Sequence, residues 1–273
     1  MVKKSNKELA FLQDLFVATD WGERFAELVD LHLTLPKKGR ILYLGSGTGS
    51  HAIALHERAG EKVVLLCVDE NSESLELARA KASAVKDRAE FLHGKLDELD
   101  LKDNQFDCVI GDASLVSPPR VPKMLKEMIR LAAPNASVAL SLPTASSFGE
   151  FFSIYWEALH NSRGVDHESD VIGLITELPT ISELEQQAEQ AGLEDIASWC
   201  QIEEFDYDSG EAFLTAPLIS DFLMHGWLET LSEKDRKKVS LEIARIINEE
   251  RHEAEFALTV KATLILGRKG HLH

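Results

Sequence analysis

The chain has 273 residues, 44% of them apolar, which suits one large α/β domain or a domain with a small cap rather than two equal domains. Its 46 acidic and 29 basic residues give a formal charge of −17, which disfavours nucleic acid and anionic membranes as partners. The three cysteines lie far apart and the histidines lack ligand spacing, so we expect no metal site.

The sequence shows no sign of a targeting or membrane-spanning segment. No 18 apolar residues run together, and the charged first residues are not followed by an apolar stretch. We therefore expect a soluble cytoplasmic protein whose substrate is a small molecule. The sequence leaves its oligomeric state open.

Alternating strand and helix patterns occupy the first half of the chain. Apolar residues at helical spacing over 5–33 predict an N-terminal helical cap, residues 1–39. Helices are then predicted at about 50–59, 72–86 and 119–132, between strands at 40–45, 62–68, 89–92, 106–111 and 136–142. Such alternation predicts an α/β fold with a parallel sheet and helices on both faces.

The second half is less regular. An aromatic group opens a lid-like insertion at 144–180, after which a capping box predicts a helix that ends at Gly192. Two further strands are predicted at 196–208 and 257–267, with a helical insertion at 216–253 between them. We expect all of 1–273 to form a single domain around a cofactor-binding core at 40–143.

A glycine-rich turn follows the first predicted strand. Gly45, Gly47 and Gly49 stand at alternate positions, where the missing Cβ atoms let the backbone turn sharply and approach a ligand. Dinucleotide-binding loops place glycines at positions one, three and six, and the sixth position here is Ser50. The spacing therefore disfavours a nicotinamide-dependent oxidoreductase, which we keep as an alternative.

Four motifs in order resemble those of the class I S-adenosylmethionine-dependent methyltransferases. They are the glycine strand-turn at 41–49, an acid at the end of the second strand, the entry to the fourth strand at 104–110 and the turn at 130–135. The resemblance covers about 40–143 and the last strand. It implies a Rossmann-like, doubly wound, mostly parallel seven-stranded sheet and S-adenosyl-L-methionine as cofactor.

The resemblance also implies a set of cofactor-binding residues. Asp69 is expected to accept hydrogen bonds from the ribose hydroxyls, since a charged acceptor strengthens such bonds. Glu70 is expected beside the adenosine. Asp112 follows the fourth strand at the carboxyl edge of the sheet, where it is expected either near the transferred methyl group or in a turn-forming role. The full predicted set is Gly45, Ser46, Gly47, Gly49, Asp69, Glu70, Lys95, Leu96 and Asp112.

Two positions depart from the family pattern. Tyr43 stands where the family has an acid two residues before the first glycine, and its hydroxyl can either take over that role or simply pack. Lys95 replaces an aspartate, so that the adenine amino group is left to Asp97 while the Leu96 N–H still reaches the ring.

Methyl transfer from a sulfonium is a direct displacement that needs alignment rather than a fixed triad, so the sequence predicts no catalytic residue. Tyr155, Trp156 and His160 are candidate substrate contacts in the lid-like insertion, with packing of the aromatic group as the alternative. We predict a methyltransferase for a small-molecule acceptor. The second alternative is a non-catalytic S-adenosylmethionine-binding module.

Overall fold

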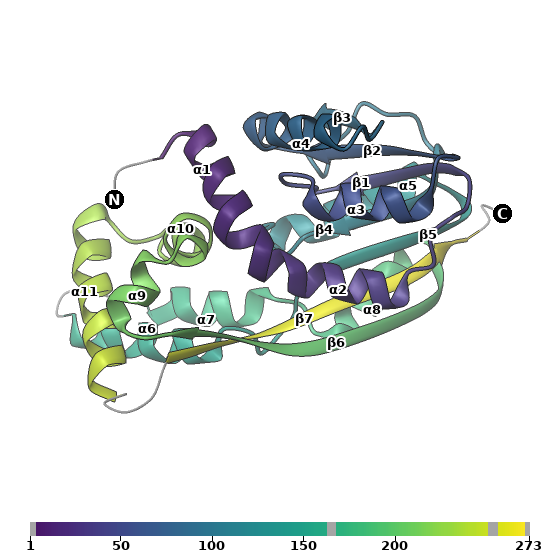
Figure 1. Ribbon diagram of the computed structural model, residues 1–273. Coiled ribbons are helices and arrows are strands. Elements are labelled where there is room, and N and C mark those ends of the chain that lie inside the picture. Colours follow the sequence, from purple (N-terminus) through teal and green to yellow (C-terminus); the bar gives the residue numbers. More distant parts are fainter. Residues whose placement is uncertain (1–3, 163–167, 251–255, 271–273) are drawn as a thin grey trace. The chain divides into compact units, whose positions relative to one another are not determined.

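A computed structural model describes residues 4–162, 168–250 and 256–270. Its centre is a seven-stranded sheet (Figure 1). The strands lie in the order β3 (Glu90–His93), β2 (Val63–Asp69), β1 (Gly39–Leu44), β4 (Phe106–Asp112), β5 (Ala132–Pro143), β7 (Phe256–Lys269) and β6 (Leu193–Tyr207). The chain therefore winds outward from β1 in one direction and then from β4 in the other, which confirms the predicted doubly wound fold.

The strands from β3 to β5 run parallel. β1 lies between β2 and β4, with Tyr43 level with Cys67 on one side and with Ile110 on the other. β5 begins at Ala132 rather than near 136 because the predicted turn is part of the strand. Asn135 has a φ of 64°, and the register between β4 and β5 shifts along this stretch.

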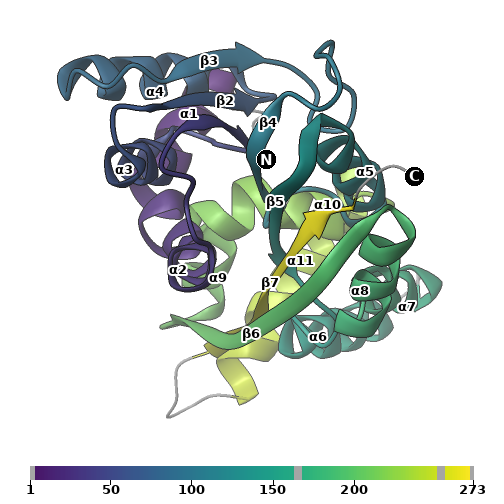
Figure 2. The same cartoon turned by 90° about the vertical axis from the view of Figure 1, so that its right-hand side faces the viewer.

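Helices cover both faces of this sheet (Figure 2). α5 (Val121–Leu131) and α8 (Ile181–Gln190) contribute Met124, Met128 and Leu184 to an apolar core that also contains Leu42 and Leu44 of β1. α2 (Glu23–His32) and α3 (Ser50–Ala59) lie on the other face, next to α4 (Ser72–Ala84). The apolar pattern of the strands thus reflects burial on both sides.

The predicted N-terminal cap is helical but not uniform. α1 (Asn6–Leu12) begins at Ser5, which forms a capping box with Glu8. It passes into a π-helix, η1 (Gln13–Gly22), and then into α2. A π-helical segment winds more widely than an α-helix, so residues that follow it are rotated relative to α-helical spacing.

Two compact units can be distinguished. Unit 1 comprises 1–142, 181–200 and 262–273, and unit 2 comprises 143–180 and 201–261. Both predicted insertions, 144–180 and 216–253, fall in unit 2. Its described elements, apart from its portions of β6 and β7, are α6 (Gly149–Asn161), α7 (Glu168–Glu177), α9 (Gly210–Thr215), the π-helix η3 (Leu218–Leu223), α10 (Met224–Trp227) and α11 (Glu233–Glu250).

The core of unit 2 is aromatic. Phe151 stacks on Trp227 with ring centroids 4.2 Å apart and on Tyr155 at 5.7 Å, and it also contacts Phe213. Such contacts bury large apolar areas at a low cost in side-chain entropy. Phe151 and Tyr155 of the lid-like insertion therefore lie in the interior of this unit.

Across the described ranges, every helix is too short or too polar to cross a bilayer.

Candidate cofactor site

The glycine turn lies against the end of β4. Gly45, Gly47 and Gly49 all have positive φ, of 72°, 53° and 80°. A Cβ atom on Gly45 would stand 2.3 Å from the carbonyl oxygen of Asp112, which is closer than such atoms approach. Only glycine fits the backbone conformation and the contact together.

The side chain of Asp69, at the end of β2, is hydrogen-bonded to this turn. Its Oδ2 accepts a hydrogen bond from the Gly47 N–H at 2.7 Å, and its Oδ1 accepts one from the Asn71 N–H at 2.9 Å. Burial and the carboxylates of Glu70 and Asp112 raise the pKa of Asp69, against the effect of these two N–H groups. Each carboxylate oxygen has a further lone pair with which to accept a ligand hydroxyl.

A cluster of charged residues lies next to Asp69 in the sequence and the structure, on the side predicted to receive the adenine. Glu70 accepts a hydrogen bond from the Leu96 N–H at 3.1 Å. Arg120, at the end of the 3₁₀-helix η2 (Pro118–Arg120), joins Glu70 at 2.5 Å to Asp97 at 2.7 Å. Hydrogen bonds from Arg120 lower the pKa values of both carboxyl groups. The structure thus brings together three residues of the adenosine side and adds an arginine that the sequence did not reveal.

Lys95 lies at the edge of this group. Its side chain is exposed and pairs loosely with Glu98 at 3.7 Å. Exposed pairs of this kind contribute little to stability. Its predicted place in the cofactor site stays a prediction.

Asp112 ends β4 at the same edge of the sheet as Asp69. Its Oδ1 accepts a hydrogen bond from the Ser114 N–H at 2.8 Å, as in an Asx turn. Burial raises the pKa of this carboxyl group, against hydrogen bonds from Ser114 that act to lower it. The turn-forming role anticipated for an aspartate here is therefore present, and it leaves the second carboxylate oxygen for other contacts.

The π-helix η1 brings two residues to the glycine turn that sequence reasoning missed. The amide nitrogen of Gln13 lies 3.0 Å from the position that a Cβ on Gly47 would take, and its oxygen accepts a hydrogen bond from Ser74 at 3.0 Å. Asp14 accepts a hydrogen bond from the Thr48 hydroxyl at 2.5 Å and pairs with Lys81. These contacts join residues 34 to 67 positions apart, so no local sequence pattern predicts them.

The predicted substrate residues belong to unit 2 and lie on two faces of α6. Tyr155 is fully buried and stacked on Phe151, as expected if this aromatic side chain packs in the core rather than contacting a substrate. Trp156 is 36% exposed, and His160 is exposed on the same side. Of the three, Trp156 and His160 are open to solvent, and their contact with a substrate stays a prediction.

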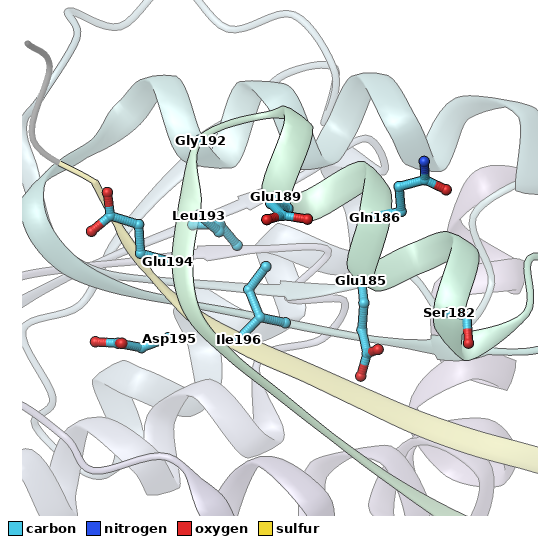
Figure 3. A pocket seen from close by; sticks show the side chains of 9 residues that line it. All are labelled: Ser182, Glu185, Gln186, Glu189, Gly192, Leu193, Glu194, Asp195 and Ile196. Carbon is cyan, nitrogen blue, oxygen red and sulfur yellow. The ribbon is translucent and has the colours of Figure 1, made fainter.

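A pocket elsewhere in unit 1 does not belong to this site. It is lined by α8 and the beginning of β6 (Figure 3). β6 is an edge strand, separated from β1 by β4, β5 and β7. The lining includes the four carboxylates of Glu185, Glu189, Glu194 and Asp195.

Comparisons with known proteins agree with this geometry. The sequence profile described as "Methyltransferase domain" matches residues 41–135. A demethylmenaquinone methyltransferase of Bacillus cereus is 30% identical over 158 residues, which are 54% of this chain and 67% of the relative. The chain belongs to the class I S-adenosylmethionine-dependent methyltransferases.

Other relatives of the methyltransferase extend the match. A demethylmenaquinone methyltransferase of Bacillus licheniformis is 27% identical over 185 residues, 64% of this chain and 78% of the relative. The structure of YcgJ from Bacillus subtilis covers 92% of the chain and is itself covered fully, with a TM-score of 0.61 and 17% identity. At that identity the likeness shows the fold of the methyltransferase alone. The cofactor of this methyltransferase is S-adenosylmethionine.

Proposed function

We propose that this methyltransferase transfers a methyl group to a small organic acceptor, with the cofactor held at the carboxyl edge of β1, β2 and β4. One observation carries the proposal: the Gly47 N–H donates a hydrogen bond of 2.7 Å to the Asp69 carboxylate. This hydrogen bond holds the glycine turn and a negatively charged hydrogen-bond acceptor together at the ends of adjacent strands, where ligands of doubly wound sheets bind.

The chain's residues fit the cofactor. Asp69 has lone pairs for a ribose diol, and the Leu96 N–H, now bonded to Glu70, can turn to an adenine ring. The glycine turn, which a Cβ at Gly45 would obstruct, accommodates the amino-acid end. The cofactor supplies an electrophilic methyl group, and the protein has to align the acceptor and exclude water.

Two observations support a small-molecule acceptor. The relatives are named for demethylmenaquinone, a small organic molecule, and the net charge of −17 works against an anionic polymer. The exposed Trp156 and His160 of α6 are proposed to contact the acceptor, through stacking and hydrogen bonding.

Isotope-labelled S-adenosylmethionine and a panel of acceptors test the proposal. The panel contains a demethylated isoprenoid quinol, a catechol, a primary amine and a thiol, and mass spectrometry detects labelled product and S-adenosylhomocysteine. We expect one acceptor to be methylated in proportion to the S-adenosylhomocysteine formed. Calorimetric binding of the cofactor without turnover of any acceptor would favour the non-catalytic module, and binding of NADH alone would favour the oxidoreductase.

Cofactor affinity is expected to depend on pH through Asp112. Because burial raises the pKa of its carboxyl group, Asp112 takes up a proton at a higher pH than an exposed aspartate does. A cationic cofactor favours the carboxylate, so its binding must release a proton once the pH falls below that raised pKa. Affinity for S-adenosylmethionine should therefore decrease as the pH is lowered through that raised pKa, at a higher pH than for an exposed aspartate. Calorimetry on the wild type and on Asp112→Asn checks this, since the cofactor affinity of the variant should change less with pH.

We also propose that residues 1–273 act as one methyltransferase-like domain in the cytoplasm, without a nucleic-acid partner. The strands β6 and β7 each have residues in both units, which supports the first point, and the acidic charge supports the second. Size-exclusion chromatography with and without a nucleic-acid duplex tests for such a partner.

A further inference from the structure

The first helical segment, residues 5–16, is in contact with the glycine turn, and we call this segment the strap. The amide nitrogen of its Gln13 lies 3.0 Å from the position that a Cβ on Gly47 would take. Gly47 is one of the two residues whose N–H groups bond to the Asp69 carboxylate. The other is Asn71, whose side chain donates a hydrogen bond of 3.3 Å to a carbonyl group of the strap. The strap therefore contacts both backbone partners of Asp69.

Apolar packing anchors the chain behind the strap but holds the strap itself weakly. Within the strap, Ala10 is the one buried residue. Three large apolar side chains of the strap are 45%, 60% and 56% exposed, namely Phe11, Leu15 and Phe16. By contrast, Val17 and Trp21, which follow in η1, are buried, and the Trp21 ring packs on Phe25 of α2 at 5.0 Å. Since little apolar area is buried beneath the strap, polar contacts have to hold it in place.

An ion pair supplies the strongest of these contacts. The Asp14 carboxylate accepts hydrogen bonds from the Thr48 hydroxyl, at 2.5 Å, and from the ammonium group of Lys81 in α4. The same ammonium group donates a hydrogen bond of 2.8 Å to the Ser50 hydroxyl. We call Asp14 and Lys81 the latch. Their side chains are 20% and 32% exposed, so water and salt ions reach the latch and weaken it.

The latch thus joins the strap to the glycine turn beside the proposed cofactor site. A ligand bound to Asp69 and the glycine turn lies next to the strap, because Gln13 and Asp69 both lie against Gly47. The π-helix η1, which begins at Gln13, is a rare conformation that occurs mostly at functional sites. A segment anchored at one end and held by polar contacts at the other is able to open as a unit.

We propose that the strap closes over the bound cofactor and that release of the latch limits cofactor exchange. The inference rests on the proposed function, since it requires the cofactor at Asp69. Asp14 and Lys81 are positioning residues, which hold the strap without contacting the cofactor.

The binding kinetics of S-adenosylhomocysteine test the proposal. Surface plasmon resonance on the full chain measures its association and dissociation rate constants. If exchange occurs only from the open strap, a weaker latch populates the open state with and without ligand and raises both constants. Asp14→Asn should therefore raise each constant by about 3-fold or more and change the dissociation constant by less than about 2-fold. A rise in the dissociation rate constant alone, or no change in either, would overturn the proposal.

Ionic strength and a second variant test the latch independently. Salt screens an exposed ion pair, so an increase from about 0.05 M to about 0.5 M NaCl should raise both rate constants of the wild type and leave those of Asp14→Asn nearly unchanged. S-Adenosylhomocysteine carries no net charge, so salt has little effect on its encounter with the protein. Lys81→Gln should reproduce the effect of Asp14→Asn, and the double variant should exchange ligand no faster than either single variant. Independent, multiplying effects would contradict the latch.

The matched control is Asp20→Asn. Asp20 lies in the same π-helix as Asp14, but it pairs with Arg24 at 3.3 Å, within one helical turn rather than across to the glycine turn. This variant should leave both rate constants as in the wild type, and a rise as large as that in Asp14→Asn would contradict the latch. Failure of the wild type to bind the ligand would contradict the proposed function, whereas tight binding with rate constants insensitive to the latch would contradict the strap alone.

Discussion

Replacement of Asp69 by asparagine is expected to weaken binding of S-adenosylhomocysteine by about 1.5–3 kcal/mol, or roughly 10- to 150-fold. The variant keeps the shape of the side chain but loses the negative charge that strengthens hydrogen bonds from ribose hydroxyls. It also places an NH₂ group where the carboxylate now accepts the Gly47 or Asn71 N–H. Calorimetric titration measures the loss, and thermal unfolding checks that the variant is folded.

Asp107→Asn is the control for Asp69→Asn. Asp107 also accepts a backbone N–H, from Arg40 at 2.8 Å, but near the start of β4 rather than at its carboxyl end. Its replacement should lower stability without changing cofactor affinity. An unchanged dissociation constant in folded Asp69→Asn would remove Asp69 from the site.

Gly45→Ala is expected to have the largest effect on stability. The added Cβ costs about 1–2 kcal/mol in the left-handed conformation and about 1–3 kcal/mol in overpacking, because the 2.3 Å contact is with the backbone oxygen of Asp112. The free energy of unfolding should fall by about 2–5 kcal/mol in a denaturant titration. Binding of S-adenosylhomocysteine should be lost as well, since the turn must move away from β4.

Gly60→Ala separates the two contributions. Gly60 has a φ of +87°, similar to that of Gly45, yet a Cβ there would meet no atom within 4 Å. Gly60 has a ψ of 172°, outside the left-handed helical region, so only the conformational cost of its own backbone, about 1–3 kcal/mol, should appear, with cofactor binding unchanged. Loss of cofactor binding in Gly60→Ala as well would contradict a role for the close approach of the glycine turn to Asp112.

Local patterns identified the strands well, because burial on both faces imposes a continuous apolar run on each central strand. All seven predicted strands occur, and the first four match within two residues at either end. The fifth begins earlier than predicted, since Pro134 and Asn135, which are typical of a turn, lie within the irregular start of β5. The motifs at the strand ends also led to the family and its cofactor, which the comparisons confirm.

Local sequence patterns did not predict which side chains meet across the fold. Arg120 bridges Glu70 and Asp97, and Asp14 reaches Thr48, although each partner is more than 20 positions away. Lys269, near the C-terminal end, donates hydrogen bonds to Asn104 and to the Ala132 carbonyl. Sequence periodicity reports which face of an element is buried, and it carries no information on which distant polar group lies opposite.

The sequence by itself determined the doubly wound α/β fold, the glycine turn and the acid at the end of the second strand, because each follows from a few neighbouring residues. Only the tertiary structure decided how Tyr43 is used. Its hydroxyl was left between packing and polar contact, and the answer depends on the juxtaposition of β1 and α3, which brings this hydroxyl within 2.8 Å of Nδ1 of His51. A hydrogen bond requires a distance of about 3 Å between its heavy atoms, and folding alone sets this distance.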